Sequence, residues 1–368
     1  MVLYKSTLQI GENMNNTEVK NRINTIFEKA SKKYRSRVNI QGCVYSEKLN
    51  IDYKYNPNEI ERPYHIASIG KMFTAVLIFL LVEENKLTLD CKISKYLQSN
   101  MLSNLFVYKG IDYSDKVTIK NLLGHTGGCA DYFEGKVIKG KKFLNLLLLE
   151  PDKIWTPVMT IEFTQNNQKA VGKPSECFNY SDTGYNLLGK IIEFVSNKSF
   201  HENLHDRIFN PLKMNDTYLM FNSSPINGIK PIENIWVNKQ EISKYKILSC
   251  DWAGGGIIST ISDLLRFSKA LQTGRFINND LLNIMRNPIN KYRYGMCYGL
   301  GQMIVDFKKF TFTNLPKYYG HSGFISTQLY YDPISEVHII LNIGIGEIMA
   351  IQDCFKIMIK INKEINKK

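Results

Sequence analysis

The chain has 368 residues, of which 44% are apolar and 12% aromatic, a composition typical of a folded globular protein and not of a disordered or fibrous one. Its formal net charge is +13, from 47 Lys and Arg against 34 Asp and Glu, and the basic residues are spread along the whole chain. Because a nucleic-acid site usually gathers such charge into one patch, the sequence predicts a solvated basic surface and no nucleic-acid partner.

The seven cysteines are scattered, with no C-x-x-C pair, which predicts neither a disulfide framework nor a thiolate zinc site. The first twenty residues lack the apolar core of a secretory signal. The longest apolar run, residues 75–82, is far shorter than the ~20 residues that span a bilayer. We therefore expect no transmembrane anchor and a cytoplasmic protein, with association with the cell envelope left open.

Strand-like patterns occur near both ends of the chain, and helical patterns dominate the middle. Residues 17–31 have a helical period, and two alternating segments, 39–46 and 49–55, follow as predicted strands. The period becomes helical from Ser68 onward. Further predicted helices are 143–149, 183–196, 200–209, 262–271 and 348–361, and further predicted strands are 298–307, 310–312, 325–331 and 337–343.

This order of elements predicts an α+β, multi-domain fold in which an antiparallel sheet is flanked by helices. We expect residues 1–80 and 290–368 to form a discontinuous sheet domain, and residues 81–289 to form an inserted, mainly helical domain. Pockets often form where two domains meet, so the active site is expected at their interface.

Ser68-Ile-Gly-Lys71 opens the most apolar helix of the chain. A serine and a lysine three positions apart on a helix project from the same face, so the amine can reach the hydroxyl. The free N–H groups at a helix N-terminus suit a developing oxyanion, and a lysine held against an apolar wall can act as a base at neutral pH. A second match, Ser243-Lys-Tyr-Lys246, lies in a polar stretch and is interpreted as coincidence.

Two further segments carry candidate chemistry. Tyr180 lies two residues before Asp182 at the start of an amphipathic helix, where Asp182 is expected to be the N-cap and the Tyr180 phenol could shuttle a proton. Later, Gly320-His321-Ser322-Gly323 precedes a strand, and its flanking glycines suit a backbone that runs close to a substrate.

Ser-x-x-Lys, then Tyr-x-Asp, then His-x-Gly, in this order, resembles the serine β-lactamase and penicillin-binding-protein superfamily. The branch it resembles most is class C, which includes class C β-lactamases, D-stereospecific peptidases and related esterases. The resemblance extends from about residue 62 to residue 342. It includes Leu122-Leu-Gly-His125-Thr-Gly-Gly, residues 211–218, the stretch 253–267 that begins Ala-Gly-Gly-Gly, and residues 298–301.

The resemblance implies a role for each matching residue. Ser68 matches the acylated nucleophile, Lys71 its proton-abstracting neighbour, and Tyr180 the tyrosine that relays protons to the leaving group. The backbone N–H groups of Ser68 and Phe324 match the oxyanion hole. His321 stands where β-lactamases place the lysine of Lys-Thr-Gly, and the substrate is expected to contact Asp182, Ser322 and Gly323. His125 is expected to be a buried, hydrogen-bonded residue and not a catalyst.

Two departures from the family pattern change the expected substrate. Asp182 replaces the usual Asn, so an acceptor-only carboxylate stands where an amide could donate a hydrogen bond. His321 replaces a fixed cation that attracts a substrate carboxylate, and a histidine is mostly neutral near pH 7. Both changes weaken the case for efficient β-lactam hydrolysis and favour esters or small amides.

The expected function is therefore a serine hydrolase that forms an acyl-enzyme and needs no cofactor. Its expected substrate is a small ester, an amide, a β-lactam or a peptidoglycan-like peptide. An alternative is a penicillin-binding sensor with little turnover. A third reading comes from His201-Glu-Asn-Leu-His205, a formal match to the zinc metallopeptidase signature. No third ligand stands out, and Pro211 follows soon after this segment, so the metal reading is disfavoured.

Overall fold

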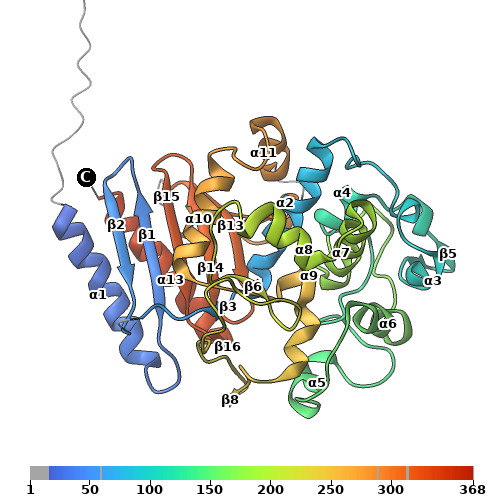
Figure 1. The fold of residues 1–368 in the computed structure, drawn as a ribbon, viewed down its shortest axis with the longest axis horizontal. Coiled ribbons are helices and arrows are strands. Elements are labelled where there is room, and N and C mark those ends of the chain that lie inside the picture. Colours follow the sequence, from blue (N-terminus) through green and yellow to red (C-terminus); the bar gives the residue numbers. More distant parts are fainter. Residues whose placement is uncertain (1–15, 59, 288–289, 312–314, 368) are drawn as a thin grey trace, which may run out of the picture.

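The computed structural model describes residues 16–58, 60–287, 290–311 and 315–367, and it contains an eight-stranded antiparallel sheet beside a mainly helical region (Figure 1). The order of strands is β10-β11-β12-β13-β14-β15-β1-β2. The two ends of the chain meet at β1 and β15, where Gln41 lies opposite Asn342. The strands are β1 (Gln41–Ser46), β2 (Ile51–Tyr55), β10 (Asn290–Arg293), β11 (Met296–Tyr298), β12 (Met303–Asp306), β13 (Lys317–Gly323), β14 (Thr327–Asp332) and β15 (Val337–Asn342).

Helices cover both faces of this sheet. Because side chains alternate along a strand, Ile339 and Leu341 of β15 pack in the same core as α1 (Asn16–Tyr34) and α13 (Ile348–Ile365). Ile340, between them, belongs to the other core, together with α2 (Gly70–Glu83) and α10 (Ile261–Gln272). Burial on both faces explains why β14 and β15 are buried at every position.

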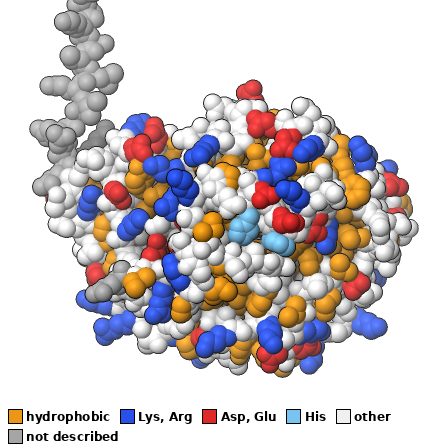
Figure 2. All heavy atoms as spheres, viewed as in Figure 1, with side chains coloured by type: hydrophobic (Ala, Val, Ile, Leu, Met, Phe, Trp, Pro, Cys, Tyr) orange, Lys and Arg blue, Asp and Glu red, His pale blue; other side chains and the backbone are white. Residues whose placement is uncertain are grey.

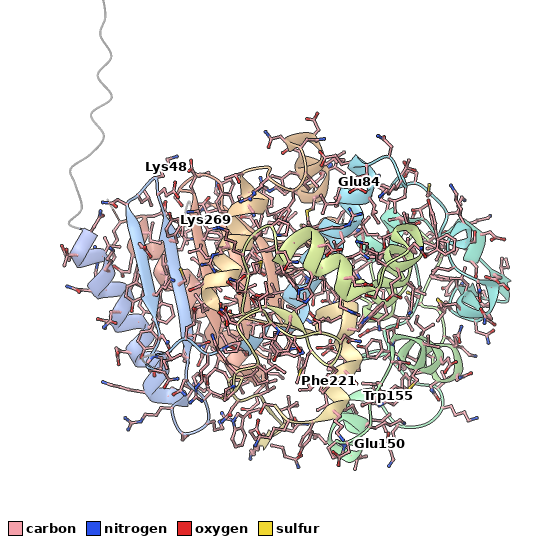
Figure 3. All side chains as sticks on the ribbon, in the orientation of Figure 1. Lys48, Glu84, Glu150, Trp155, Phe221 and Lys269 are labelled. Atoms are coloured by element: carbon pink, nitrogen blue, oxygen red, sulfur yellow. The ribbon has the colours of Figure 1, made fainter. Side chains whose placement is uncertain are left out.

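Helix α10 comes from the middle of the chain yet packs on the sheet. Its Lys269, labelled in Figure 3, donates to the Glu47 carboxylate at 2.7 Å and to the Tyr45 hydroxyl at 2.9 Å. The sheet itself is built from both chain ends, as the sequence predicts. The boundaries proposed for two domains, at residues 80 and 290, stay a prediction.

Helix α2 is the central element of the helical region. Almost every side chain from Gly70 to Phe79 is fully buried, as expected for a helix that is apolar all round. Phe73 stacks on Phe267 of α10 with ring centroids 3.8 Å apart, and the Thr74 hydroxyl donates to the Ala253 carbonyl at 2.6 Å. These contacts fix the helix between the sheet and the neighbouring helices α7 (Asp182–Ser196) and α9 (Trp252–Gly255).

Most of the predicted elements are confirmed, with three corrections. The single strand predicted over residues 298–307 is two strands, since β11 ends at Tyr298 and β12 spans Met303–Asp306. Residues 200–209 form α8 (Phe200–Leu204) followed by one π-helical turn (His205–Phe209). The predicted strand 310–312 is wrong, since Lys308–Thr311 is the short helix α12, and residue 312 lies outside the described residues. The remaining elements are α3 (Ser99–Leu102), α4 (Ile119–Leu123), α5 (Phe143–Leu149), α6 (Pro157–Asn167), α11 (Asn279–Arg286), β3 (Tyr64–His65), β4 (Val107–Tyr108), β5 (Ile111–Asp112), β6 (Tyr218–Leu219), β7 (Trp236–Val237), β8 (Gln240–Glu241), β9 (Ile257–Ser259), β16 (Ile345–Gly346) and five 3₁₀ or π turns.

Further features of the molecule concern the cysteines, the surface charges and the apolar character of the helices. All seven cysteines are free thiols. On the face drawn in Figure 2, Lys and Arg side chains are dispersed among acidic and neutral ones and do not form one continuous patch. In the part of the chain that the structure describes, no helix combines the length and the apolar character needed to cross a membrane.

Candidate active site

The Ser68 turn is a strained segment between β3 and α2. Residues Ala67–Ile69 form one 3₁₀ turn, η1, and Ala67 has φ +49°, in the left-handed region that favours glycine. Two hydrogen bonds hold it: His65 Nδ1 accepts the Ala67 N–H at 3.1 Å, and Thr327 Oγ1 donates to the Ile66 carbonyl at 2.9 Å. As a result Ser68 is partly exposed at the start of a buried helix.

A glycine run allows the backbone of α9 to press against this turn. A Cβ added at Gly255 would lie 2.6 Å from the carbonyl carbon of Ala67 and 3.1 Å from the Ser68 nitrogen. A Cβ added at Gly70 would lie 2.8 Å from the Gly255 Cα. The Ala-Gly-Gly-Gly stretch noted in the sequence is therefore a close contact between two backbones beside Ser68.

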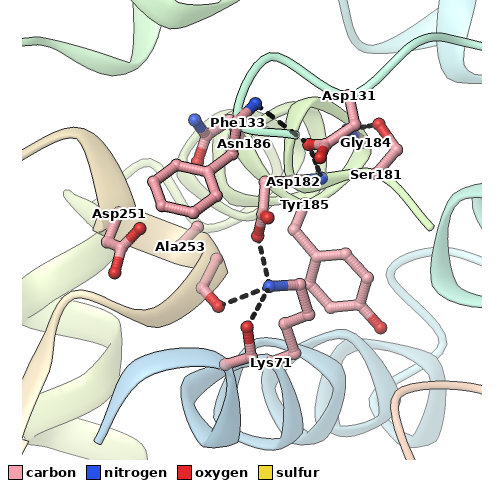
Figure 4. A network of polar contacts seen from close by, with 12 residues as sticks. Lys71, Asp131, Phe133, Ser181, Asp182, Gly184, Tyr185, Asn186, Asp251 and Ala253 are labelled. Atoms are coloured by element: carbon pink, nitrogen blue, oxygen red, sulfur yellow. Dashed lines mark hydrogen bonds and ion pairs between the residues drawn. The ribbon is translucent and has the colours of Figure 1, made fainter. Parts of the chain in front are cut away.

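Lys71 is fully buried, and its ammonium group has three acceptors (Figure 4). Its Nζ lies 3.1 Å from the Ser68 Oγ and 2.8 Å from the Gly254 carbonyl oxygen. It also forms an ion pair with the Asp182 carboxylate. Three acceptors match the three N–H donors of an ammonium group, so the amine is held in one place beside the Ser68 hydroxyl.

Asp182 does not cap α7, contrary to expectation. Ser181 is the N-cap, with its Oγ accepting the Gly184 N–H at 3.2 Å, and Asp182 is the first residue of the helix. The Asp182 side chain is therefore free to turn to Lys71, while its N–H donates to Asp131 Oδ1 at 2.9 Å. Burial, and then the charge of Asp182, raise the pKa of Asp131 to about 7.

Tyr180 covers Lys71 from another side. The Lys71 Nζ lies 4.9 Å from the centre of the Tyr180 ring. Burial and the nearby Asp182 charge raise the pKa of Tyr180 well above its ordinary value, and a hydrogen bond with Ser68 acts in the opposite direction. Tyr180 is thus a neutral phenol at physiological pH, which can donate a proton but does not persist as a phenolate.

His321 lies behind Tyr180, fully buried, with ring centroids 6.3 Å apart. Its Nε2 is 3.0 Å from the Tyr298 hydroxyl, and its Nδ1 is 2.8 Å from the Ser322 carbonyl oxygen. Since a carbonyl only accepts, Nδ1 carries the proton and Nε2 accepts from Tyr298. Burial, and then the charge of Lys71, lower the pKa of His321 to about 3, so the ring is neutral.

His125 is buried in the same aromatic layer. Its ring centre is 4.3 Å from that of Tyr180 and 4.6 Å from that of Tyr298, and its Nδ1 accepts the Ser181 N–H at 3.1 Å. Burial lowers its pKa well below the ordinary value, and the charge of Lys71 acts in the same direction. His125 therefore supports the start of α7 and the Tyr180 ring as a neutral side chain.

These groups surround a cleft of about 1110 Å³ that is open to solvent. Gly323 brings β13 against the Ser68 turn, because a Cβ at that position would lie 2.7 Å from the Ala67 Cβ. The cleft wall includes six of the predicted residues, whereas Lys71 and His321 lie behind it. Those six are Ser68, Tyr180, Asp182, Ser322, Gly323 and Phe324.

Part of the cleft wall is apolar and belongs to one hydrophobic cluster; we call this part the apolar chamber, and sequence analysis did not foresee it. Asp251 and His65 also reach the cleft wall, and they too were missed, since neither lies in a motif with a chemical signature. The stretch 253–267 was noted, but nothing in it indicated that the Gly254 carbonyl would hold Lys71. The chamber is lined by Leu147, Ile235, Val237, Ile242, Leu248, Phe324 and Ile325.

The two competing motifs have ordinary structural roles. Glu202 completes a capping box with Ser199 at the start of α8, and His205 Nε2 lies 3.0 Å from the Ser223 hydroxyl. Nowhere in the described ranges do three His, Cys, Asp or Glu side chains gather as they would to hold a metal ion. Ser243 lies in a turn, not at the start of a helix.

Curated relatives match part of this chain. Among curated relatives, "Penicillin-binding protein 4*" of Bacillus subtilis is 29% identical over 228 residues, which are 58% of this chain and 46% of that protein. "Protein flp" of Staphylococcus aureus strain MW2 is 29% identical over 189 residues, 47% of this chain and 34% of that one. The chain thus spans less than half the length of these curated relatives.

Solved structures share the fold over nearly the whole chain. A D-amino acid amidase from Ochrobactrum anthropi SV3, complexed with L-phenylalanine, has a TM-score of 0.77 at 21% identity, covering 95% of this chain and 98% of that chain. EstCE1, described as a hydrolase with promiscuous acyltransferase activity, has a TM-score of 0.75 at 16% identity, covering 96% and 99%.

A sequence model of the family described as Beta-lactamase matches residues 52–345, which include the Ser68 turn, Tyr180 and the His321 strand. The match covers most of the chain. The chain belongs to the Beta-lactamase family, within the serine β-lactamase and penicillin-binding-protein superfamily.

Proposed function

We propose that the protein is a serine hydrolase that acts on small amides or esters through a covalent acyl-enzyme at Ser68. The observation that carries the proposal is the partly exposed Ser68 hydroxyl in the cleft, 3.1 Å from the amine of the buried Lys71. A nucleophile within hydrogen-bond reach of a base, with the base oriented by further groups, is the arrangement that covalent catalysis requires.

Each proposed role follows from position. Ser68 Oγ attacks the acyl carbon and gives its proton to the Lys71 amine. The amine accepts this proton when the proton shared by the Lys71–Asp182 pair lies on Asp182, so that the amine is neutral. The carbonyl oxygen becomes an oxyanion that the backbone N–H groups of Ser68 and Phe324 stabilise. Tyr180 relays this proton from Lys71 to the leaving group, so the phenol is neutral again when the leaving group departs. Water then attacks the Ser68 ester and gives its proton back to Ser68 Oγ by the same route. His321 is assigned as a positioning residue, through Tyr298 and the layer beneath Tyr180.

The apolar chamber and the charges in the cleft indicate what kind of acyl group the substrate carries. A chamber lined by aliphatic and phenyl side chains suits an apolar side chain on the acyl side of the scissile bond. The neutral His321 offers no fixed positive charge to a substrate carboxylate. Structural neighbours described as an amidase and as an acyltransferase-active hydrolase are compatible with small amides or esters, and others are described as penicillin-binding proteins.

The first test is covalent labelling. Exposure to a fluorophosphonate or an activated ester is expected to add one acyl or phosphonyl mass to the intact protein, and Ser68→Ala is expected to abolish it. Ser243→Ala, which alters the second Ser-x-x-Lys match, serves as the control and should label like wild type. Labelling that persists in Ser68→Ala would contradict the proposal.

A second candidate is a penicillin-binding protein that acylates but hardly turns over. The similarity to the curated relative "Penicillin-binding protein 4*" supports this candidate. With a chromogenic ester, a hydrolase gives steady product release over many turnovers. A burst of one equivalent per Ser68 that then stops would favour the binding protein instead.

A further inference from the structure

Asp251 is a carboxylate in the cleft that the proposed reaction does not use. It ends the 3₁₀ helix η5 (Lys246–Asp251), directly before α9, and its side chain is 24% exposed on the cleft wall. The Cys250 thiol, a weak donor, lies 4.0 Å from Asp251 Oδ1. Among the described residues, no Lys or Arg lies within 4.0 Å of the Asp251 carboxylate, whereas Asp182 is neutralised by Lys71. Figure 4 shows Asp251 to one side of the Lys71–Asp182 network, without a drawn contact to it.

His65 faces this carboxylate with an unused donor. The side chain is 2% exposed, and its Nδ1 accepts the Ala67 N–H, so the proton lies on Nε2. Nε2 has no hydrogen-bond partner and lies 3.8 Å from Asp251 Oδ2, too far for a hydrogen bond. Burial lowers the pKa of His65 to about 4, so the ring is neutral and does not balance the charge of Asp251.

The cleft therefore has a place for a cation that the chain itself does not fill. A carboxylate beside apolar side chains is costly unless a positive partner or hydrogen bonds accompany it. Leu248 and Cys250, on the same turn as Asp251, line the same cleft, and Leu248 belongs to the apolar chamber. Asp251 therefore shares a cleft wall with side chains that suit an apolar group.

We propose that Asp251, positioned by His65, binds the ammonium group of a substrate that carries a free amine beside an apolar side chain on its acyl part. This proposal rests on the proposed function and names its substrate class: amides or esters of apolar amino acids with an unblocked amine. The pKa of Asp251, raised to about 7 by burial and by the charge of Asp182, supports it, because a bound ammonium would remove that cost. His65 is a positioning residue in this arrangement.

A matched pair of substrates tests the anchor by kinetics. Phenylalanine p-nitroanilide, as each enantiomer, and 3-phenylpropionyl p-nitroanilide differ only in the amine. We expect wild type to prefer the amine-bearing compound, and Asp251→Asn to lose that preference by at least about tenfold in kcat/KM, mainly through KM. Any loss on the compound without the amine should be smaller by about that factor. Equal losses on both compounds, or no loss on either, would overturn the proposal.

Glu134→Gln is the matched control, since Glu134 also reaches the cleft wall but is exposed at its mouth. It should keep the preference of wild type if one carboxylate is responsible. A loss equal to that of Asp251→Asn would show a diffuse negative potential and would contradict a specific anchor. His65→Gln should weaken the preference less than Asp251→Asn, because it leaves the carboxylate in place.

A binding measurement separates this inference from the proposed function. Calorimetric titration of Ser68→Ala with 2-phenylethylamine and with 2-phenylethanol needs no catalysis. We expect the amine to bind at least about tenfold more tightly than the alcohol, and Ser68→Ala/Asp251→Asn to lose this difference. If wild type hydrolyses nothing but the difference depends on Asp251, the proposed function fails and the anchor stands. Equal binding of both compounds would overturn the anchor, whatever the hydrolysis.

Discussion

The pairing of Lys71 with a carboxylate decides how the nucleophile can be activated. An opposite charge in contact with an amine favours its protonated form, whereas a base must be deprotonated to take the Ser68 proton. The resemblance to the family shows only that Asp182 stands where the family usually has Asn. The structure shows that this Asp contacts Lys71 directly and that Asp131 holds its backbone.

Asp182→Asn should therefore make acylation of Ser68 faster. The amide carries no negative charge and does not stabilise an ammonium group in contact with it, so the amine is free to take the Ser68 proton. The rate of fluorophosphonate labelling at neutral pH is expected to rise by about tenfold. An unchanged rate in Asp182→Asn would mean that this ion pair does not control Lys71 as the base.

At the level of residues, local patterns predicted the parts of the site that lie in motifs. Ser68, Lys71 and Tyr180 lie together in the structure. Each stands at or near the start of a helix, and the start of a helix can be predicted from sequence. The exchange of roles between Ser181 and Asp182 was not readable, since both residue types cap helices well. Asp131, Asp251 and His65 act through tertiary contacts, which no local pattern encodes.

At the level of elements, the site depends on backbones that approach more closely than side chains would allow. Helix α9 contacts η1 through Gly255, and α2 meets α9 through Gly70. On the other side, β13 contacts η1 through Gly323. These three contacts fix the Ser68 turn between the helical region and the sheet, including the unusual φ of Ala67.

Gly255→Ala should damage the site more than the fold. The added methyl would meet backbone atoms of Ala67 and Ser68, which cannot move aside like a flexible side chain, and overpacking of this kind costs about 1–3 kcal/mol. We expect labelling of Ser68 to fall at least tenfold while far-UV circular dichroism stays unchanged. Gly184→Ala in α7 is the control, because its Cβ would have only ordinary contacts, from 3.7 Å outward.

That control should be neutral or more stable than wild type by up to about 1 kcal/mol, the usual gain of alanine over glycine in a helix. Denaturant unfolding of both variants measures the free energy difference. Full labelling activity in Gly255→Ala would show that the close contact with α9 does not position the nucleophile.

Long periodic elements were predicted well, and short ones were not. Helices α7, α10 and α13 lie within a few residues of their predicted bounds, because each has an amphipathic period of three turns or more. The three-residue alternation at 310–312 was too short to distinguish a strand from a turn of helix. The order of the strands, which brings β1 beside β15, depends on contacts between distant segments and was predicted only as a sheet built from both ends.

At the level of the whole molecule, burial of neutral histidines links stability to pH. Of the six histidines, four are buried: His65, His125, His321 and His338. Burial lowers the pKa of each, to about 4 for His65 and His338 and to about 3 for His321. Below about pH 6.5, the pKa of a histidine in the unfolded chain, the unfolded chain binds protons that the folded chain does not bind. Each of these histidines therefore makes the fold less stable as pH falls.

Two buried carboxyl groups have the opposite effect on stability: they make the fold more stable as pH falls, over part of the same pH range. The pKa values of Asp131 and Asp251 are both raised to about 7, so in the folded chain these groups hold protons that the unfolded chain has released. Their contribution to stability is present at low pH and is lost as pH rises toward 7. The dependence of the free energy of unfolding on pH is the sum of both effects. A variant that changes one of these groups is needed to isolate its contribution.

His338→Gln isolates one histidine far from Ser68. His338 lies on β15, its Nδ1 is 2.8 Å from the Ser268 hydroxyl of α10, and burial followed by the Lys269 charge lowers its pKa to about 4. Between pH 7.5 and pH 5 this group should cost wild type about 2 kcal/mol, a cost that the variant does not share. Urea unfolding at the two pH values is therefore expected to show a smaller loss of stability on acidification in His338→Gln. Parallel losses in wild type and His338→Gln would mean that the pKa of His338 is not lowered in the fold.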